Sequence, residues 1–156
     1  MNICFYAPFK PIGHEHPSGD LVIASGLYEF LSRRGHKIRL ASKLRARWIF
    51  WKPWRLPYFL WERRRVMRRF SRNNTDLWLT YHSYYKAPDL LGPSATNRIN
   101  IPYVIFQGIF STKRKRDIRT WPGFVLNKRA LGAADHVFTN KRVDFFNPGE
   151  YCRRTA

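Results

Sequence analysis

Acidic side chains are scarce in this sequence. Ten Asp and Glu residues stand against 29 Lys and Arg residues, which gives a formal net charge of +19 over 156 residues. Such an excess implies an acidic partner: nucleic acid, an anionic membrane surface or a phosphorylated substrate.

Cysteine and long apolar runs are also lacking. Cys4 and Cys152 are the only cysteines, so we expect no disulfide framework and favour a reducing compartment. No stretch of about 20 apolar residues occurs, which predicts no membrane-spanning segment. The strand-like run at the N-terminus does not have the charged start of a secretory signal.

Several signatures of enzymes are missing. The sequence contains no G-x-x-x-x-G-K-[ST], no C-x-x-C and no H-E-x-x-H. His14 and His16 flank Glu15 in a Pro-rich loop, not at the i, i+4 spacing of a helical zinc pair. We therefore expect no metal site.

The apolar pattern instead predicts an α/β domain. Hydrophobic residues make up 44% of the chain, which is enough for one core, so residues 1–156 are taken as a single domain. Strands are predicted at 2–7, 36–42, 76–82, 101–108 and 134–140. Helices are predicted at 21–35, where Leu27, Phe30 and Leu31 share a face, at 58–72, briefly within 84–93, and at 124–133. This alternation is typical of a Rossmann-like parallel sheet sandwiched by helices.

Polar and glycine residues follow four of the predicted strands. The carboxyl ends of parallel strands meet at one edge, where such sheets bind ligands. Glycines and a helix N-terminus there suit a diphosphate, although the Gly13-to-Gly19 spacing is not that of G-x-G-x-x-G. The candidate site consists of Gly13, Ser18, Gly19, Asp20, His82, Ser83, Gln107, Gly108 and Asn140.

Residues 43–72 combine tryptophan with arginine. One interpretation is a solvated basic helix that covers the sheet. A second is a surface that lies on an anionic bilayer, because indole rings prefer the headgroup level and basic residues pair with lipid phosphates. A third is nucleic-acid binding, with aromatic rings stacked on bases. The candidate membrane-binding residues are Trp48, Trp51, Trp54, Arg63, Arg64 and Arg68.

Several motifs, taken in order, resemble a known family. They are the opening Asn2-Ile3-Cys4-Phe5-Tyr6, the loop with Ser18-Gly19-Asp20, the helix end Leu31 to His36, and Ala134 to Asn140. Together with 76–82 and 101–108 they resemble the N-terminal half of retaining GT-B glycosyltransferases of family 4. The resemblance covers nearly the whole chain.

The resemblance implies two Rossmann-like domains that face a cleft. The N-terminal domain binds the acceptor, and the C-terminal domain, which is absent from this chain, binds the nucleotide-sugar. The resemblance implies that Gly19 and Asp20 lie in the loop that approaches the donor's diphosphate. Many members carry a histidine where this chain has Gln107; a glutamine can hydrogen-bond a sugar hydroxyl but does not relay a proton. His82 then lines the acceptor pocket, and both residues are the catalytic candidates.

The function expected from the resemblance is transfer of a sugar from a nucleotide-diphosphate sugar to a glycan or lipid-linked acceptor. It needs no cofactor beyond the nucleotide-sugar, and this chain alone is expected to be inactive. The expected location is cytoplasmic, peripheral on the inner face of the membrane. The alternative is a basic, non-enzymatic module that binds nucleic acid or anionic membrane. Nucleic acid is disfavoured because no RRM, KH or zinc signature occurs.

Overall fold

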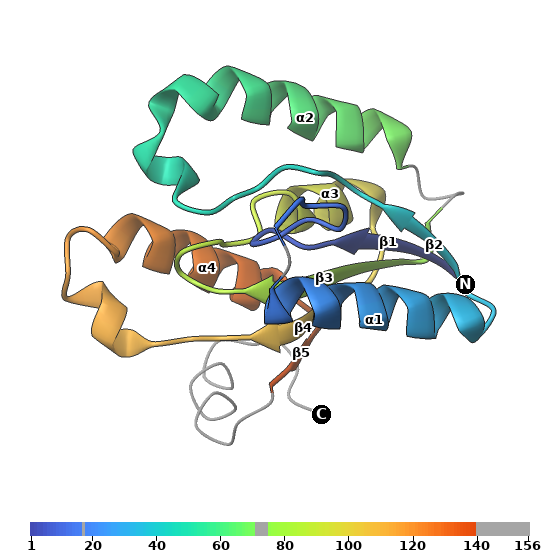
Figure 1. The fold of residues 1–156 in the computed structure, drawn as a ribbon. Coiled ribbons are helices and arrows are strands. Elements are labelled where there is room, and N and C mark those ends of the chain that lie inside the picture. Colours follow the sequence, from blue (N-terminus) through green and yellow to red (C-terminus); the bar gives the residue numbers. More distant parts are fainter. Residues whose placement is uncertain (17, 71–74, 140–156) are drawn as a thin grey trace.

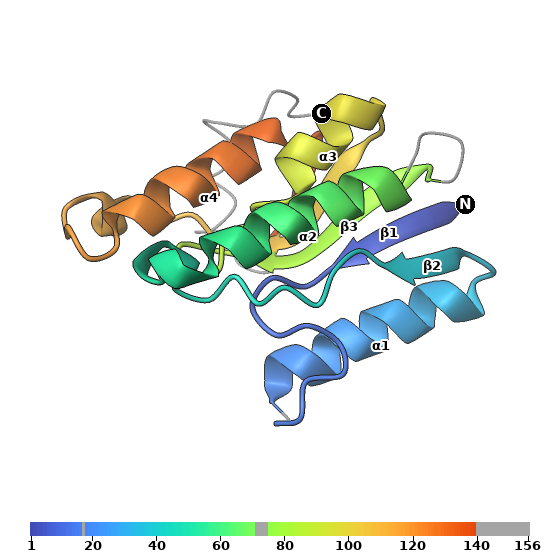
Figure 2. The same ribbon diagram turned by 90° about the horizontal axis from the view of Figure 1, so that it is seen from above.

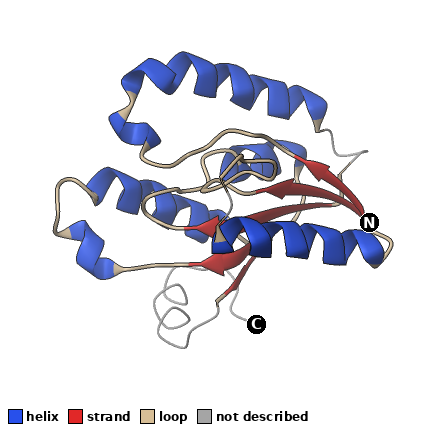
Figure 3. Cartoon of the chain, viewed as in Figure 1, coloured by secondary structure: helices blue, strands red, loops and turns tan. Residues whose placement is uncertain are grey.

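A computed structural model describes residues 1–16, 18–70 and 75–139. Its centre is a five-stranded sheet in which every neighbouring pair is parallel (Figures 1 and 3). The strand order is β2-β1-β3-β4-β5. The strands are β1 (Asn2–Tyr6), β2 (Lys37–Leu40), β3 (Leu77–Ser83), β4 (Tyr103–Gly108) and β5 (His136–Phe138). The predicted Rossmann-like α/β architecture is confirmed.

Helices cover both faces of the sheet. They are α1 (Gly19–Arg33), α2 (Leu56–Arg69), α3 (Gly92–Ile99) and α4 (Trp121–Ala133). Short 3₁₀ helices η1 (Ile49–Trp51), η2 (Pro53–Arg55) and η4 (Thr112–Lys115) lie in the connections. Figure 2 shows α1 running beside β2, apart from α2, α3 and α4.

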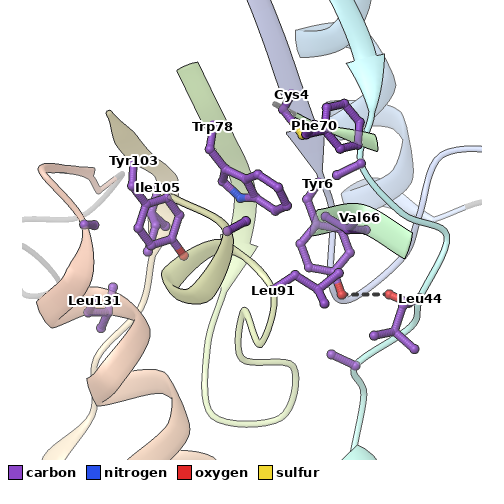
Figure 4. Packing of buried hydrophobic residues seen from close by; sticks show 14 of the residues in the cluster. Cys4, Tyr6, Leu44, Val66, Phe70, Trp78, Leu91, Tyr103, Ile105 and Leu131 are labelled. Atoms are coloured by element: carbon purple, nitrogen blue, oxygen red, sulfur yellow. Dashed lines mark hydrogen bonds between the residues drawn. The ribbon is translucent and has the colours of Figure 1, made fainter. Parts of the chain in front are cut away.

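Side chains that alternate along the strands divide the core in two. Cys4, Tyr6 and Trp78 point into a cluster that α2, α3 and α4 complete, while Phe5 and Leu79 pack with residues of α1. Figure 4 shows the first cluster, in which the Tyr6 hydroxyl donates a 2.9 Å hydrogen bond to the Leu44 carbonyl. Burial raises the pKa of the Cys4 thiol, so this cysteine is a packing residue and not a reactive one.

Two sequence expectations are wrong in detail. No helix lies within the loop 84–91, and α3 begins only at Gly92 because the carboxylate of Asp89 accepts hydrogen bonds from the Leu91 and Gly92 amides. Phe30 does not join the core face of α1: it is 53% exposed, with the Arg34 guanidinium over its ring. Residues 71, 72 and 140 of the predicted elements lie outside the described residues.

Helix α2 packs on the sheet through an acidic side chain as well as apolar ones. Val66 and the following Phe70 are buried, and Glu62 is buried beside them. The Ser42 hydroxyl and the Arg65 guanidinium both donate to Glu62. Burial raises the pKa of the Glu62 carboxyl, but these hydrogen bonds and the charges of Arg65 and Arg69 outweigh it and hold the pKa below its usual value.

The pKa of Glu62 is lower in the folded state than in the unfolded state. The ionised carboxylate therefore contributes to stability at pH values above the ordinary carboxyl pKa, and this contribution is lost as the pH falls through the folded-state pKa. We predict that Glu62→Gln lowers the free energy of unfolding at pH 7 by about 1–3 kcal/mol and flattens its decline below about pH 4.5. Urea unfolding from pH 3 to 7 measures this. The exposed Glu29→Gln is the control, and an equal flattening in that variant would contradict the assignment.

Candidate functional site

The direction of the connections reverses between β1 and β3. From β1 the chain passes through α1 to β2 on one side, whereas β3 and β4 lie on the other side. Doubly wound sheets bind their ligands in the crevice outside the carboxyl ends of the strands at this reversal. Here the loop 7–18 follows β1, and His82 lies next to the end of β3.

Asp20 and His82 meet at this point. Ser18 caps α1 by accepting a hydrogen bond from the Leu21 amide, which places Asp20 in the first helical turn. The Asp20 Oδ1 lies 2.7 Å from the His82 Nδ1. A carboxylate can only accept, so Nδ1 carries the proton. In the neutral imidazole the lone pair is then on Nε2, which has no hydrogen-bond partner among the described residues.

Aromatic rings surround the imidazole. Tyr84 stacks on it with ring centroids 4.7 Å apart, and the Phe9 centroid lies 5.9 Å away. Tyr81 contacts it edge-on. The Tyr81 hydroxyl is buried without a partner among the described residues, and burial together with the charge of Asp20 raises the pKa of Tyr81 to about 12. The histidine is therefore held rigidly, with a neutral phenol near its carboxylate partner.

Two residues of the site have left-handed backbone conformations. His82 has φ +58° and Gln107 has φ +66°. Their neighbours pair as Tyr81 with Phe106 and Ser83 with Gly108, so the two residues lie opposite each other across β3 and β4. A non-glycine residue in this region costs about 1–3 kcal/mol, and such strain gathers at functional sites. The Gln107 Oε1 is also buried without a partner in the part of the chain that the structure describes.

The other predicted residues of the strand edge have different roles. Ser83 is fully buried; its hydroxyl donates to Asn127 and accepts from the Asp89 amide, so we correct its assignment to a structural one. Gly108 is buried too, and a Cβ there would come within 2.5 Å of Val137, so packing requires this glycine.

The predicted glycines Gly13 and Gly19, unlike Gly108, are not enclosed by packing. A Cβ at either position would meet nothing within 4 Å, and Gly13 has φ +88°, which favours glycine at this turn. Gly19 is the first residue of α1, one position before Asp20. Asn140 lies outside the described residues.

Among the described residues, no group of three side chains that could bind a metal ion occurs.

Four residues in or beside the site were not predicted as such from the sequence: Asp89, Tyr81, Phe9 and Tyr84. Asp89 is buried, and its carboxylate accepts from Thr80, Tyr103 and Trp78 besides the amides that start α3. The spacing of Asp89 before Gly92-Pro93 is a helix-start signal that could have marked it. The aromatic residues carry no such signal, because any of the many Phe and Tyr residues could have lined the site.

The predicted membrane-binding residues fall into two groups. Trp54 is 72% exposed in η2, and Arg63, Arg64 and Arg68 are exposed on α2. Trp48, in contrast, is half-buried against Phe50 and Tyr85. The half-exposed Trp51 donates its indole N–H to the Arg119 carbonyl, which fixes η1 in place.

Around Trp54 and the arginines the surface is both apolar and basic. Leu56, Leu60 and Trp61 are each more than 40% exposed. Between α2 and α3 a pocket of about 330 Å³ is lined by Leu60, Arg63, Arg64, Met67, Arg68 and Arg98. We call the exposed side chains of 54–68 the α2 surface. No helix of the described chain is long and apolar enough to cross a membrane.

Comparison with protein-family models found no match, and a search of curated proteins found none either.

The geometry predicts an unusual imidazole tautomer. With Asp20 accepting from Nδ1, His82 in its neutral form holds its proton on Nδ1, whereas free histidine prefers Nε2. Two-bond ¹H–¹⁵N correlation spectra distinguish the two forms. We expect Nδ1–H in the wild-type protein and a return of the Nε2–H form in Asp20→Ala. A dominant Nε2–H form in the wild-type protein would contradict the pairing.

Proposed function

We propose that this chain is the acceptor-binding half of a glycosyltransferase. The observation that supports it best is the Asp20–His82 pair, which lies at the reversal of the sheet with the His82 Nε2 unpaired among the described residues. A general base must offer a lone pair within reach of the hydroxyl proton that it removes. His82 offers Nε2 for this purpose, and Asp20 stabilises the imidazolium that forms.

Gln107 takes a positioning role in this proposal. Its amide can donate to and accept from sugar hydroxyls, and its buried Oε1 gains a partner when a hydroxyl approaches. Gly19 leaves open space at the N-terminus of α1, where backbone N–H groups favour the donor's diphosphate. The nucleotide of the sugar donor requires a second domain, supplied in the same chain or by a partner. No metal or other cofactor takes part.

The α2 surface brings this half to its acceptor at the membrane. Burying Trp54 and Trp61 at the headgroup level removes exposed indole from water, and Arg63, Arg64 and Arg68 pair with lipid phosphates. The salt bridges among the described residues include none of these three arginines, so they are free for lipids. Peripheral attachment of this kind suits a lipid-linked acceptor.

Transfer of radiolabelled sugar tests the enzymatic part. In membranes from cells that express the protein, where a donor-binding partner is present, we expect transfer from a nucleotide-sugar to a lipid or glycan acceptor. His82→Ala should lower the rate at least about 100-fold, the contribution of a general base. Gly19→Trp should block transfer without altering the melting temperature.

Gly26→Trp is the matched control for Gly19→Trp, because a Cβ at Gly26 also meets nothing within 4 Å and the residue lies on the same helix, further from the site. Equal transfer by Gly19→Trp and Gly26→Trp, or full activity in His82→Ala, would refute the placement.

Co-sedimentation with vesicles tests the membrane part. We expect binding to phosphatidylglycerol-containing vesicles that weakens with salt, and little binding to neutral vesicles. Trp54→Ala should weaken it about tenfold or more, since burying such a side chain contributes about 1.5–3 kcal/mol. Phe30→Ala, an exposed aromatic residue on the α1 face, should bind as the wild type does. Salt-sensitive binding to random DNA without binding to vesicles would contradict the proposal.

A further inference from the structure

A second group of basic side chains lies on residues 45–55, which lead into the α2 surface. The segment between β2 and α2 forms a pocket of about 240 Å³ that is lined by Arg45, Arg47, Trp48, Lys52 and Arg55. Four of the five lining residues are basic and none is acidic. The volume is below the roughly 300 Å³ at which sites for drug-sized molecules begin, so it fits a small anionic group.

The segment that carries these cations follows the carboxyl edge of the sheet. The Ala41 amide donates to the Phe5 carbonyl, the Ala46 amide to the Pro8 carbonyl and the Trp48 amide to the Lys86 carbonyl. It therefore passes from β1 to the loop after β3, as Figure 1 shows in teal between β2 and α2. The pocket is held next to the sheet reversal by backbone hydrogen bonds.

Aromatic contacts connect the pocket to the histidine. The Arg47 guanidinium lies over the Phe9 ring, 5.5 Å from its centroid, and Phe9 in turn contacts both His82 and Tyr84. Burial raises the pKa of Tyr84 to about 12, and the positive charges of Arg47 and Arg45 act on the same hydroxyl in the opposite direction. Both arginines are thus near the ring that stacks on His82.

The cations of the pocket have no acidic partners among the described residues. The ion pairs of the described residues are Glu29–Arg33, Glu62–Arg65 and Asp20–His82, none of which involves this pocket. The Arg45 Nε is also buried without a hydrogen-bond partner among the described residues. A buried guanidinium N–H that lacks an acceptor is costly unless a ligand supplies one. Phosphate oxygens are the acceptors that suit its planar fork.

We propose that this pocket binds a phosphate or diphosphate group of the acceptor while the acceptor's sugar reaches His82. This inference rests on the proposed function and narrows it: the acceptor is a phosphorylated saccharide and not a neutral glycan. Arg45 and Arg47 bind the phosphate oxygens, and Lys52 and Arg55 add positive charge. The exposed Trp54, directly before Arg55, places the lipid of a lipid-linked diphosphate at the membrane surface.

Calorimetric titration of the protein with inorganic pyrophosphate, at constant ionic strength, tests the pocket directly. We expect saturable binding, and a loss of about tenfold or more in Arg47→Gln, the effect of removing one charge-assisted contact. Arg47 is exposed, so its replacement leaves the core intact. Arg45→Gln should lose at least as much, and Arg45→Lys should not restore the affinity, because an ammonium lacks the planar fork.

The matched control is Lys113→Gln, which removes one charge from the exposed η4 and should leave pyrophosphate binding unchanged. Equal weakening by Arg47→Gln and Lys113→Gln would show general charge screening and overturn the proposal. So would the lack of saturable binding to the wild-type protein.

Two further ligands identify the source of the phosphate. Glucose 1-phosphate represents a soluble acceptor, and farnesyl diphosphate in neutral phosphatidylcholine vesicles represents a lipid-linked one. Tighter binding of farnesyl diphosphate supports a lipid-borne diphosphate, whereas tighter binding of glucose 1-phosphate supports a soluble sugar phosphate. The proposal is overturned if the protein binds both ligands more weakly than it binds chloride. Pyrophosphate binding does not require catalysis. The proposed phosphate pocket is therefore not refuted if the sugar-transfer assay fails, and the proposed transferase function is not refuted if the pocket binds no pyrophosphate.

Discussion

The buried carboxylate of Asp89 is the constraint on which the geometry of the site depends. It accepts hydrogen bonds from Thr80 on β3 and Tyr103 on β4, and from the amides that begin α3. Next to it the Ser83 hydroxyl joins the Asp89 amide to Asn127 of α4, whose side chain continues to the Ile109 carbonyl. An unpaired carboxylate at this depth would cost several kcal/mol, so these groups are fixed together. The network thereby sets the carboxyl ends of β3 and β4, and with them the left-handed residues His82 and Gln107.

The strain at those two residues has a physical consequence. The sheet pairing resumes at Ser83 and Gly108 after the left-handed step, so the kink is local and the surrounding ladder holds it. The step brings the His82 ring to Asp20 at the start of α1, on the other side of the sheet reversal. Three separate parts of the sequence thus meet at one imidazole: the loop after β1 with Phe9, the first turn of α1 with Asp20, and the end of β3 with the aromatic residue Tyr84 after it.

The sequence predicted the parallel sheet, three of its four α-helices approximately, and the strand edge as the candidate site. Periodicity and turn residues carry that information, because they act within a few residues. It did not predict the pairing of Asp20 with His82, which depends on residues 62 positions apart, nor the use of Ser83 inside the core. The burial of Glu62 and the exposure of Phe30 depend on which neighbours face each helix, and a helical pattern alone does not contain that. The sequence shows the positive charge of residues 45–55, but only the fold places Arg47 beside Phe9 and both Arg45 and Arg47 near Tyr84.

A crystal structure of the protein with a saccharide diphosphate tests the central claim most directly, namely that His82 faces the acceptor. We expect a sugar hydroxyl within hydrogen-bond distance of the His82 Nε2, the Asp20–His82 contact retained, and the diphosphate against Arg45 and Arg47. A sugar bound away from the carboxyl ends of β1 and β3, with the His82 Nε2 facing only solvent, would contradict it.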